Sequence, residues 1–440
     1  MNKKLIQWSI AVGLGGFLFG LDTAVISGAE QDIQRLWNLD PFYHGVIISM
    51  ALIGTIIGAA FGAIPADKYG RKKTLLWIGL LFFVSAIGAA LAPEEYSFMI
   101  FRFIGGISIG ASSVVAPVYI SEIAPPEHRG RLGISFQFNI VLGILIAYVS
   151  NYLLEGVGGA DDWRWMLGIV AVPSLIFSAM MLFTPETPRW LLLYDGDEQN
   201  ARTTLALTHP NTEAAIQEIR NSRIEKTGSE KLFSGQFSKP VMLAFLFAFF
   251  NQVSGINAII YFAPRIFEMT GLGKETALLS TAGIGIVNLL FTMLGWVLID
   301  QFGRRKLMYI GSFGYLISLG LITLAFFNET YANVPLYTFI FIAAHAIGQG
   351  SVIWVFISEI FPNTVRASGM ALGSLTHWVF AALIALVFPY FAEQFGGGPI
   401  FLFFFLMMVL QLLYVWRMMP ETKGESLENL QHKMTGHKLN

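Results

Sequence analysis

One carboxylate stands in an apolar, glycine-rich stretch near the start of the chain. Residues 16–29 read GFLFGLDTAVISGA, and Asp22 is their single ionisable residue. An ionisable side chain within a hydrocarbon layer is costly, and such residues commonly belong to a functional site with a charged partner. Arg102, in another apolar stretch, is the candidate partner. The two residues predict an ion pair that protonation of Asp22 breaks or, alternatively, one that only braces two helices.

A second set of charges occurs twice along the chain. SEIAPPEHRG and SEIFPNTVRA each place an acid seven residues before an arginine, and DKYGRKK and DQFGRRK each supply a further basic cluster. Ion pairs among these residues would close the cytoplasmic side of a membrane protein and break when it opens, at a cost of only about 0–1 kcal/mol for each exposed pair. The alternative is ordinary anchoring of cytoplasmic loops by positive charge. The residues are Arg71, Glu122, Arg129, Arg304, Glu359 and Arg366.

Carboxamides gather in apolar segments of the second half. Asn251, Gln252 and Asn257 share one segment, and Asn288 lies in the next. A buried amide is costly unless it is hydrogen-bonded. An amide offers one acceptor and two donors without a charge to desolvate, which suits a neutral ligand that carries several hydroxyl groups. Hydrogen bonding from helix to helix is the alternative for any one of them.

The composition places these residues in a membrane protein. Of the 440 residues, 55% are hydrophobic and 13% are charged, whereas soluble proteins are about 25% charged. Runs of about 20 apolar residues cross a hydrocarbon core, and the chain contains twelve. Glycines and prolines within them predict bent helices, and the alternating pattern of a β-barrel is absent. The expected spans are 6–28, 45–65, 74–92, 97–119, 132–153, 164–184, 240–269, 276–298, 307–327, 335–358, 368–392 and 398–418.

The chain is internally duplicated. Motifs that follow spans 2, 4 and 6 recur after spans 8, 10 and 12, between 233 and 237 residues later. Parallel duplicates of this kind place a substrate site near the membrane midplane. We therefore expect an all-α fold of twelve transmembrane helices in two pseudo-symmetric six-helix bundles, residues 1–186 and 240–419. A cytoplasmic linker, 187–239, joins them with short amphipathic helices predicted from Ile216, Ile219 and Ile224, and 420–440 form a tail.

The distribution of basic residues predicts the orientation. Ten Lys and Arg residues lie in the connections after spans 2, 4, 8 and 10, whereas the opposite connections hold Arg35 and Lys274. Because cytoplasmic loops are enriched in these residues, both termini should be cytoplasmic. The chain has no cysteine, which excludes disulfide and thiolate chemistry.

The motifs together resemble the sugar porter family of the major facilitator superfamily. They are GFLFGLDTAVISG, DKYGRKK, FRFIGGISIG, SEIAPPEHRG, PETPRW, NQVSGIN, DQFGRRK, SEIFP and PETKG, and they occur in the family's order from about residue 10 to 428. The resemblance is strongest to bacterial proton-coupled pentose and hexose symporters. It implies the major facilitator fold and a monosaccharide and a proton as partners.

The resemblance also implies a set of sugar-binding residues. Trp354 is similar to the family's stacking platform for the sugar ring, while His377 stands where relatives carry Gln or Asn. His377 therefore either replaces that amide or hydrogen-bonds within the bundle. Phe19 is compatible with sugar contact and with plain packing. The full set is Phe19, Gln137, Asn251, Gln252, Asn257, Tyr261, Asn288, Gly350, Trp354, His377 and Trp378.

The expected function is proton-coupled uptake of a monosaccharide by alternating access. An uncoupled uniporter, in which Asp22 and Arg102 are only structural, is the main alternative, and a membrane sugar sensor is a weaker one. No nucleophile has an evident base and no group has metal-ligand spacing, so we expect no enzyme, cofactor or metal. We further expect a monomer in a bacterial inner membrane, surrounded by lipid, with no nucleic-acid partner. The sequence does not identify the sugar.

Overall fold

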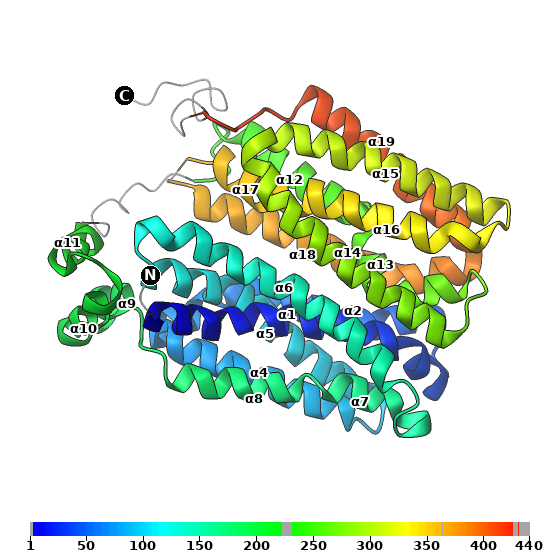
Figure 1. Cartoon of the computed structure of the whole chain (residues 1–440), viewed down its shortest axis with the longest axis horizontal. Helices are drawn as coiled ribbons and strands as arrows, with labels where there is room; N and C mark the ends of the chain where they lie inside the picture. The colour runs from blue at the N-terminus through cyan, green and yellow to red at the C-terminus, as the bar shows by residue number, and fades with distance from the viewer. Residues whose placement is uncertain (1–2, 222–230, 363, 426–429, 431–440) are drawn as a thin grey trace. The chain divides into compact units, whose positions relative to one another are not determined.

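The computed structural model describes residues 3–221, 231–362, 364–425 and 430, and all regular elements within these residues are helices (Figure 1). Twelve segments are long and apolar enough to cross a membrane, as the sequence predicts. The helices of the first half are α1 (Lys3–Leu36), α2 (Pro41–Phe61), α3 (Ala63–Tyr69), α4 (Arg71–Ala90), α5 (Glu95–Ile123), α6 (Pro126–Leu154), α7 (Asp162–Gly168) and α8 (Ala171–Leu182).

The second half begins after a group of short helices. These are α9 (Pro188–Trp190), α10 (Glu198–Thr208) and α11 (Thr212–Asn221). The longer helices that follow are α12 (Ser238–Val253), α13 (Ile256–Glu268), α14 (Lys274–Phe302), α15 (Arg304–Phe327), α16 (Val334–His345), α17 (Ser351–Ile360), α18 (Arg366–Phe395) and α19 (Gly397–Arg417), with a π-helical segment, η5 (Ala346–Gly350), between α16 and α17.

The chain divides into two compact units. The first contains residues 1–29 and 50–228, and in it α4 packs against α5 and α8. Helices α2 and α5 approach at glycines, because a Cβ at Gly54 or Gly58 would lie 2.2 Å from the carbonyl oxygen of Phe103 or Ile107. Small residues allow such close crossings of membrane helices, so Gly54 and Gly58 let α2 and α5 pack backbone to backbone.

The second unit contains residues 30–49 and 229–440. Within it α15 packs against α16 and α19, and α12 packs against α18. The span formed by α12 and α13 is broken at Gly255, whose φ is +90°, and it bends again at Phe262, just before Pro264. Broken helices at membrane depth free backbone groups that can serve a site. This unit therefore holds its interrupted helices next to the amides of the predicted sugar site.

The outer hairpin of the first two helices belongs to the second unit. Helix α1 is continuous from Lys3 to Leu36, yet its residues from Glu30 onward are grouped with the second unit, as is the beginning of α2. A Cβ at Gly45 would lie 1.8 Å from the Leu386 carbonyl oxygen, so α2 touches α18 backbone to backbone. We call residues 30–49 the outer hairpin.

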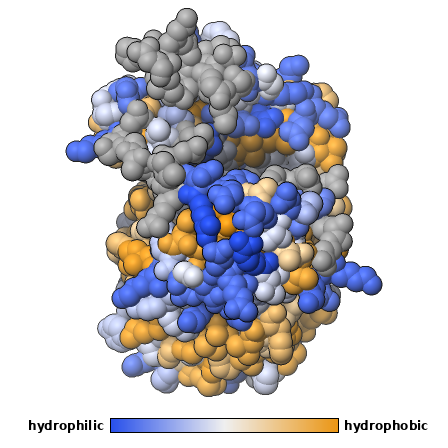
Figure 2. Space-filling model, turned by 90° about the vertical axis from the view of Figure 1, so that its left-hand side faces the viewer, coloured by the Kyte–Doolittle hydropathy of each residue, from blue (hydrophilic) through white to orange (hydrophobic). Residues whose placement is uncertain are grey.

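Apolar side chains also cover the outside of the helices. Trp77 on α4 is 44% exposed, and Val172 and Ile176 on α8 are 62% and 50% exposed. Figure 2 shows the contrast at one end of the molecule, where hydrophilic side chains gather in the middle and hydrophobic ones cover the flank below. A soluble protein rarely exposes contiguous apolar surface on this scale, so these faces match lipid.

The segment after α8 folds on itself. Trp190, Leu191 and Ala201 form one apolar cluster, and Leu205, Ala215 and Ile216 form a second with Ile219 packed against it. Ion pairs of Arg202 with Glu213 and of Arg220 with Glu198 connect α10 to α11 on the exposed side. Of the predicted apolar positions, Ile224 lies outside the described residues.

Candidate functional site

Asp22 and Arg102 form a buried ion pair between α1 and α5. The Arg102 guanidinium donates to Asp22 Oδ1 at 2.8 Å and to the Asp22 carbonyl oxygen at 3.3 Å, and both residues are 2% exposed. The second carboxylate oxygen, Oδ2, is buried and accepts no hydrogen bond from the described residues. A Cβ at Gly105 would lie 3.3 Å from it. The carboxylate is therefore held through one oxygen, and the other is a buried acceptor without a hydrogen bond from the described residues.

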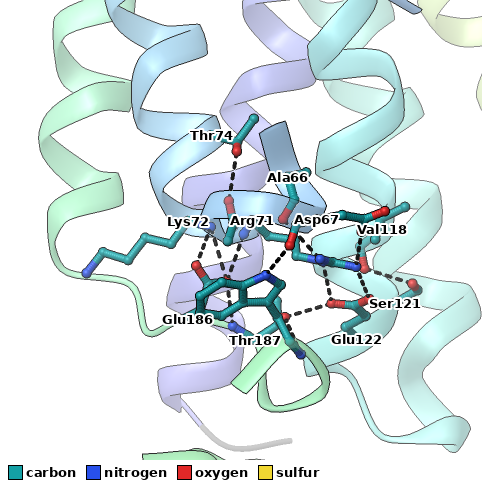
Figure 3. A network of polar contacts seen from close by, with 12 residues as sticks. Ala66, Asp67, Arg71, Lys72, Thr74, Val118, Ser121, Glu122, Glu186 and Thr187 are labelled. Atoms are coloured by element: carbon teal, nitrogen blue, oxygen red, sulfur yellow. Dashed lines mark hydrogen bonds and ion pairs between the residues drawn. The ribbon is translucent and has the colours of Figure 1, made fainter. Parts of the chain in front are cut away.

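The first cluster of predicted gate residues joins α4, α5 and the segment after α8 (Figure 3). Arg71 donates to both oxygens of Glu122 at 3.1 Å, and Thr187 donates its hydroxyl to Glu122 Oε2 at 2.7 Å. Glu186 accepts the backbone N–H groups of Arg71 at 3.0 Å and Lys72 at 3.0 Å, which are unpaired donors at the beginning of α4. Burial raises the pKa of the Glu186 carboxyl, and these backbone hydrogen bonds oppose that shift.

The second half repeats this cluster residue by residue. Arg304 donates to the two oxygens of Glu359 at 3.1 and 2.7 Å, and Thr422 donates to Glu359 Oε2 at 2.6 Å. Glu421 accepts the backbone N–H groups of Arg304 and Arg305 at the beginning of α15. Of the predicted gate residues, the arginine of each basic cluster thus meets the glutamate of its own half.

Of the two remaining gate arginines, Arg366 takes no part in these pairs among the described residues. Arg366 donates from Nε to the Phe361 carbonyl oxygen at 3.3 Å, and its Nη2 is buried without a partner among the described residues. The side chain of Arg129 lies outside the described residues. Glu186 and Glu421, which the sequence analysis did not assign to the gate, are instead the acids that fix the helix beginnings.

Three of the predicted amides, Asn251, Gln252 and Asn257, form one connected group in the second unit. Asn257 donates to Gln252 Oε1 at 2.7 Å, and Gln252 Nε2 donates to Asn251 Oδ1 at 2.8 Å. The same Gln252 nitrogen lies 3.0 Å from His377 Nδ1. The His377 ring contacts Trp354 and Trp378, with centroids 5.3 and 4.8 Å apart. The structure therefore brings six of the predicted sugar-binding residues together.

The other predicted residues lie on the elements that frame this group or in the first unit. Tyr261 is one turn beyond Asn257 on α13 and is fully buried, and Asn288 on α14 accepts the Thr292 hydroxyl at 3.4 Å. Gly350 ends the π-helical segment, one turn before Trp354. Phe19 on α1 and Gln137 on α6 are half-buried residues of the first unit.

A buried charge cluster at the outer hairpin has no counterpart in the sequence predictions. Glu30 and His44 are fully buried, and His44 Nε2 lies 2.7 Å from Glu30 Oε2. Arg265, just beyond the bend in α13, donates to the two Glu30 oxygens at 2.9 and 2.6 Å and to Gln34. In the sequence, these three residues were visible only as ionisable side chains near the ends of three separate spans.

A polar chain behind the amide group was also not predicted. Tyr315 on α15 contacts His345 on α16 at 2.5 Å and donates to Gln349 Oε1 at 2.9 Å. Gln349 donates to Gln411 on α19, and Gln411 donates to the Ser312 hydroxyl at 2.8 Å. Ser312, Tyr315, Gln349 and Gln411 are at most 1% exposed. In the sequence, only the stretch HAIGQG pointed to this chain, because it places His345 and Gln349 within an apolar span.

These features define a class of protein. Twelve membrane-spanning helices in duplicated halves, a buried ion pair, and an uncharged amide and aromatic group at membrane depth are typical of a transporter of a small polar solute. Comparison with known families gives the assignment. The family model described as "Sugar (and other) transporter" matches residues 8–434. The chain belongs to this family, and its fold is that of the major facilitator superfamily.

Individual relatives match over nearly their whole length. The arabinose-proton symporter of Bacillus subtilis is 38% identical, over 97% of this chain and 94% of the relative. The D-xylose-proton symporter of Escherichia coli K12 is 34% identical, over 98% and 96%. Among solved structures, the inward open conformation of the xylose transporter XylE from E. coli is similar with a TM-score of 0.87 and 31% identity, covering 98% of this chain and 99% of the other.

Proposed function

We propose that this protein carries a monosaccharide, a pentose or a hexose, into the cell together with a proton. The observation that supports coupling is the buried Asp22–Arg102 pair, in which one carboxylate oxygen holds the arginine and the other is bare. Two relatives that match almost end to end are named proton symporters for pentoses. The amide and tryptophan group around His377 supplies hydrogen bonds and an aromatic face, which a sugar requires.

The pair would work as a switch between α1 and α5. With Asp22 ionised the pair is satisfied and the two helices are held together. A proton on Asp22 removes the charge that holds Arg102 and lowers the cost of moving α1 relative to α5. Symport follows if proton and sugar together favour a rearrangement that neither favours alone, because a ligand shifts an equilibrium only by its differential affinity for the two states.

The rest of the assignment follows from the same features. The protein is a multi-pass inner-membrane protein, with both termini on the cytoplasmic side as the basic residues predict. It acts as a monomer, without enzymatic chemistry and without a cofactor. Arg71, Glu122, Arg304 and Glu359, with Arg129 and Arg366, act at the cytoplasmic gate. Phe19, Gln137, Tyr261, Asn288 and Gly350 complete the sugar site.

Reconstitution into proteoliposomes tests the coupling. The wild-type protein should accumulate a labelled pentose or hexose against its gradient when a proton gradient is imposed, with proton entry accompanying sugar entry. Asp22→Asn should lose accumulation almost completely yet retain exchange of labelled for unlabelled sugar, because the sugar site is intact and only the proton site is removed. A panel of unlabelled sugars in competition would identify the substrate.

The same experiment distinguishes the alternative. An uncoupled uniporter would equilibrate sugar without proton movement in the wild-type protein, and Asp22→Asn would behave like the wild type. Undiminished uphill uptake by Asp22→Asn would therefore defeat the coupling proposal while leaving sugar transport in place. Trp354→Ala serves as the matched control, since it should weaken sugar binding and exchange together.

A further inference from the structure

A serine on a third helix lies close to the free oxygen of Asp22. Asp22 Oδ2 is buried and accepts no hydrogen bond from the described residues. A Cβ at Gly105 on α5 would lie 3.3 Å from Asp22 Oδ2 and 2.4 Å from the hydroxyl oxygen of Ser85. The two oxygens therefore lie beside the same point, where Gly105 has no side chain. Ser85 is on α4 and is 1% exposed, so α1, α4 and α5 all contribute a polar group here.

The hydroxyl proton of Ser85 is directed away from Asp22. Ser85 Oγ donates to the Phe101 carbonyl oxygen on α5 at 2.7 Å. A backbone carbonyl oxygen only accepts, so the direction of this hydrogen bond is fixed. A hydroxyl has one proton to donate, and its oxygen accepts through two lone pairs. Ser85 therefore has acceptor capacity left for a donor beside Gly105.

Arg102 is the charged group that contacts Asp22. Apart from Asp22 and Arg102, the apolar stretches of this unit's helices contain no Asp, Glu, His, Lys or Arg, and the phenols among them are Tyr148 and Tyr152 on α6. These stretches are residues 5–29 of α1, 50–61 of α2, 74–90 of α4, 97–118 of α5, 132–154 of α6 and 171–182 of α8. Besides Arg102, the groups of these stretches that act on the carboxyl are therefore uncharged.

The ionised and the neutral carboxyl of Asp22 differ in what they can do with Ser85. An ionised carboxylate only accepts, so Oδ2 and the Ser85 oxygen are two acceptors while the serine proton stays on Phe101. A neutral carboxyl with its proton on Oδ2 is a donor. The proton also removes the charge that holds Arg102, which frees the carboxyl to turn toward Ser85. Because residue 105 is glycine, no side chain at that position separates the two oxygens.

We propose that Ser85 accepts a hydrogen bond from protonated Asp22 and thereby sets the proton affinity of the coupling site. A hydrogen bond that only the neutral acid makes favours the neutral acid, whereas Arg102 favours the ionised form. Each state of Asp22 then has its own stabilising neighbour. Ser85 acts through Asp22 as a positioning residue, and Gly105 provides the space. The proposal rests on the proposed function, because it assigns a partner to the proton of the symport.

The pH dependence of uptake tests this role. In proteoliposomes at a fixed membrane potential, the initial rate of uptake would be measured over a pH series with the labelled pentose or hexose that the wild-type protein accumulates. Ser85→Ala removes the hydrogen bond of the neutral acid, so a higher proton concentration is needed and the pH of half-maximal uptake should fall. The expected loss of proton affinity is about three- to tenfold, or about 0.5–1 pH unit. Ser85→Cys has only a weak sulfur acceptor, should shift in the same direction, and serves if Ser85→Ala does not fold.

Ser178→Ala on α8 is the matched control. Ser178 is also a buried serine beside a glycine of α4, because a Cβ at Gly79 would lie 2.3 Å from its oxygen. Its hydroxyl donates to the Ser174 carbonyl oxygen at 2.9 Å, within its own helix. The same change at this position should leave the pH of half-maximal uptake as in the wild type. An unchanged or raised pH of half-maximal uptake in Ser85→Ala, or an equal fall in Ser178→Ala, overturns the proposal.

Infrared difference spectroscopy observes the hydrogen bond itself. The C=O stretching band of protonated Asp22, identified by its loss in Asp22→Asn, should move to higher frequency in Ser85→Ala, because the carboxyl has lost a hydrogen bond. A purely structural role of Ser85 would leave the band in place, and an unmoved band overturns the proposal. If these results fail while the wild-type protein still accumulates sugar with protons, the proposed function stands. Sugar transport without proton movement in the wild-type protein would instead overturn the proposed function.

Discussion

At the scale of single residues, the two oxygens of Asp22 have different surroundings. Oδ1 accepts from Arg102, and Oδ2 is buried with no donor among the described residues. A buried acceptor without a partner costs about 1–3 kcal/mol. A proton on Oδ2 would remove the charge without displacing any existing hydrogen bond to that atom. The geometry thus identifies Oδ2 as the atom that receives the proton in the proposed cycle.

The Asp22–Arg102 pair should also contribute strongly to the free energy of unfolding. Arg102→Met leaves the Asp22 carboxylate buried and uncompensated, and breaking a buried pair in this way costs about 3–5 kcal/mol. Replacing both partners, Asp22→Leu with Arg102→Met, should recover most of that loss, because no charge is left in the apolar surroundings. The free energy of unfolding in detergent micelles, measured for the three proteins by denaturant titration, checks this. Equal losses in the single and double variants would contradict a buried charge as the cause.

Residue types alone predicted only part of the site. Asn251, Gln252, Asn257, Trp354 and His377 stand out in the sequence, and the structure connects them. Tyr315 and Gln411 give no comparable signal, because they lie in spans 9 and 12, about 100 residues apart. Their contact with Gln349 depends on how α15, α16 and α19 pack, which no local pattern encodes.

At the scale of elements, α4 and α15 begin in the same way. Each follows a glycine with positive φ, Gly70 at +98° and Gly303 at +86°, and each has a glutamate on its first backbone N–H groups. A Cβ at Gly70 would lie 2.2 Å from Glu186 Oε2, and one at Gly303 would lie 2.6 Å from Glu421 Oε2. The repeated GR in DKYGRKK and DQFGRRK is thus explained by the backbone and by the carboxylate beside it.

These glycines should be intolerant of even one methyl group. Gly70 and Gly303 combine a positive φ with ψ of 156° and 168°, a backbone region that is essentially restricted to glycine and costs a residue with a Cβ about 1–3 kcal/mol. Loss of the carboxylate cap costs about 0.5–2 kcal/mol more, so Gly70→Ala and Gly303→Ala should each lower the free energy of unfolding by about 1.5–5 kcal/mol. Gly133→Ala on α6 is the matched control, because its Cβ would meet nothing within 4 Å, and it should stabilise by about 0.5–1 kcal/mol. A neutral Gly70→Ala would contradict the described cap.

The outer hairpin is a feature of the fold that hydropathy does not predict. The sequence predicts residues 1–186 as one bundle, whereas contacts group residues 30–49 with the second unit. The reason is the buried set of Glu30, His44 and Arg265, which ties the end of α1 and the beginning of α2 to α13. Hydropathy defines where helices cross the membrane, and it contains no information on which neighbour a helix end contacts.

At the scale of the whole molecule, duplication was the most informative signal. It predicted the equivalence of the two halves, and the paired clusters around Glu122 and Glu359 repeat down to the threonine that donates to each acid. Breaks within spans were predicted only as bends. Their form, a left-handed Gly255 and a π-helical segment before Ser351, depends on tertiary packing.

The paired clusters lead to a prediction for alternating access. Arg71–Glu122 and Arg304–Glu359 each connect helix ends of their own half that the basic residues predict to be cytoplasmic. If the closed inner side depends on these ends, Glu122→Gln or Glu359→Gln should each raise the inward-open population about fivefold or more, because both pairs are largely buried and removing one partner of a buried pair costs more than the roughly 1 kcal/mol of an exposed pair. The double variant should show the product of the two effects, because distant sites add.

Thiol labelling measures that population directly, because the chain has no cysteine. Ser135→Cys, on the first turns of α6, introduces a single thiol whose reaction with a membrane-impermeant maleimide is followed in inside-out vesicles. The labelling rate should rise in the order wild type, single variants, double variant. Asp161→Asn is the control, because it removes an exposed pair with Arg164 at the beginning of span 6, an end predicted to lie on the side opposite the cytoplasm. The labelling rate should therefore stay as in the wild type. A rate that rises equally in Asp161→Asn, or that does not rise in the double variant, would show that these pairs do not control the inner side.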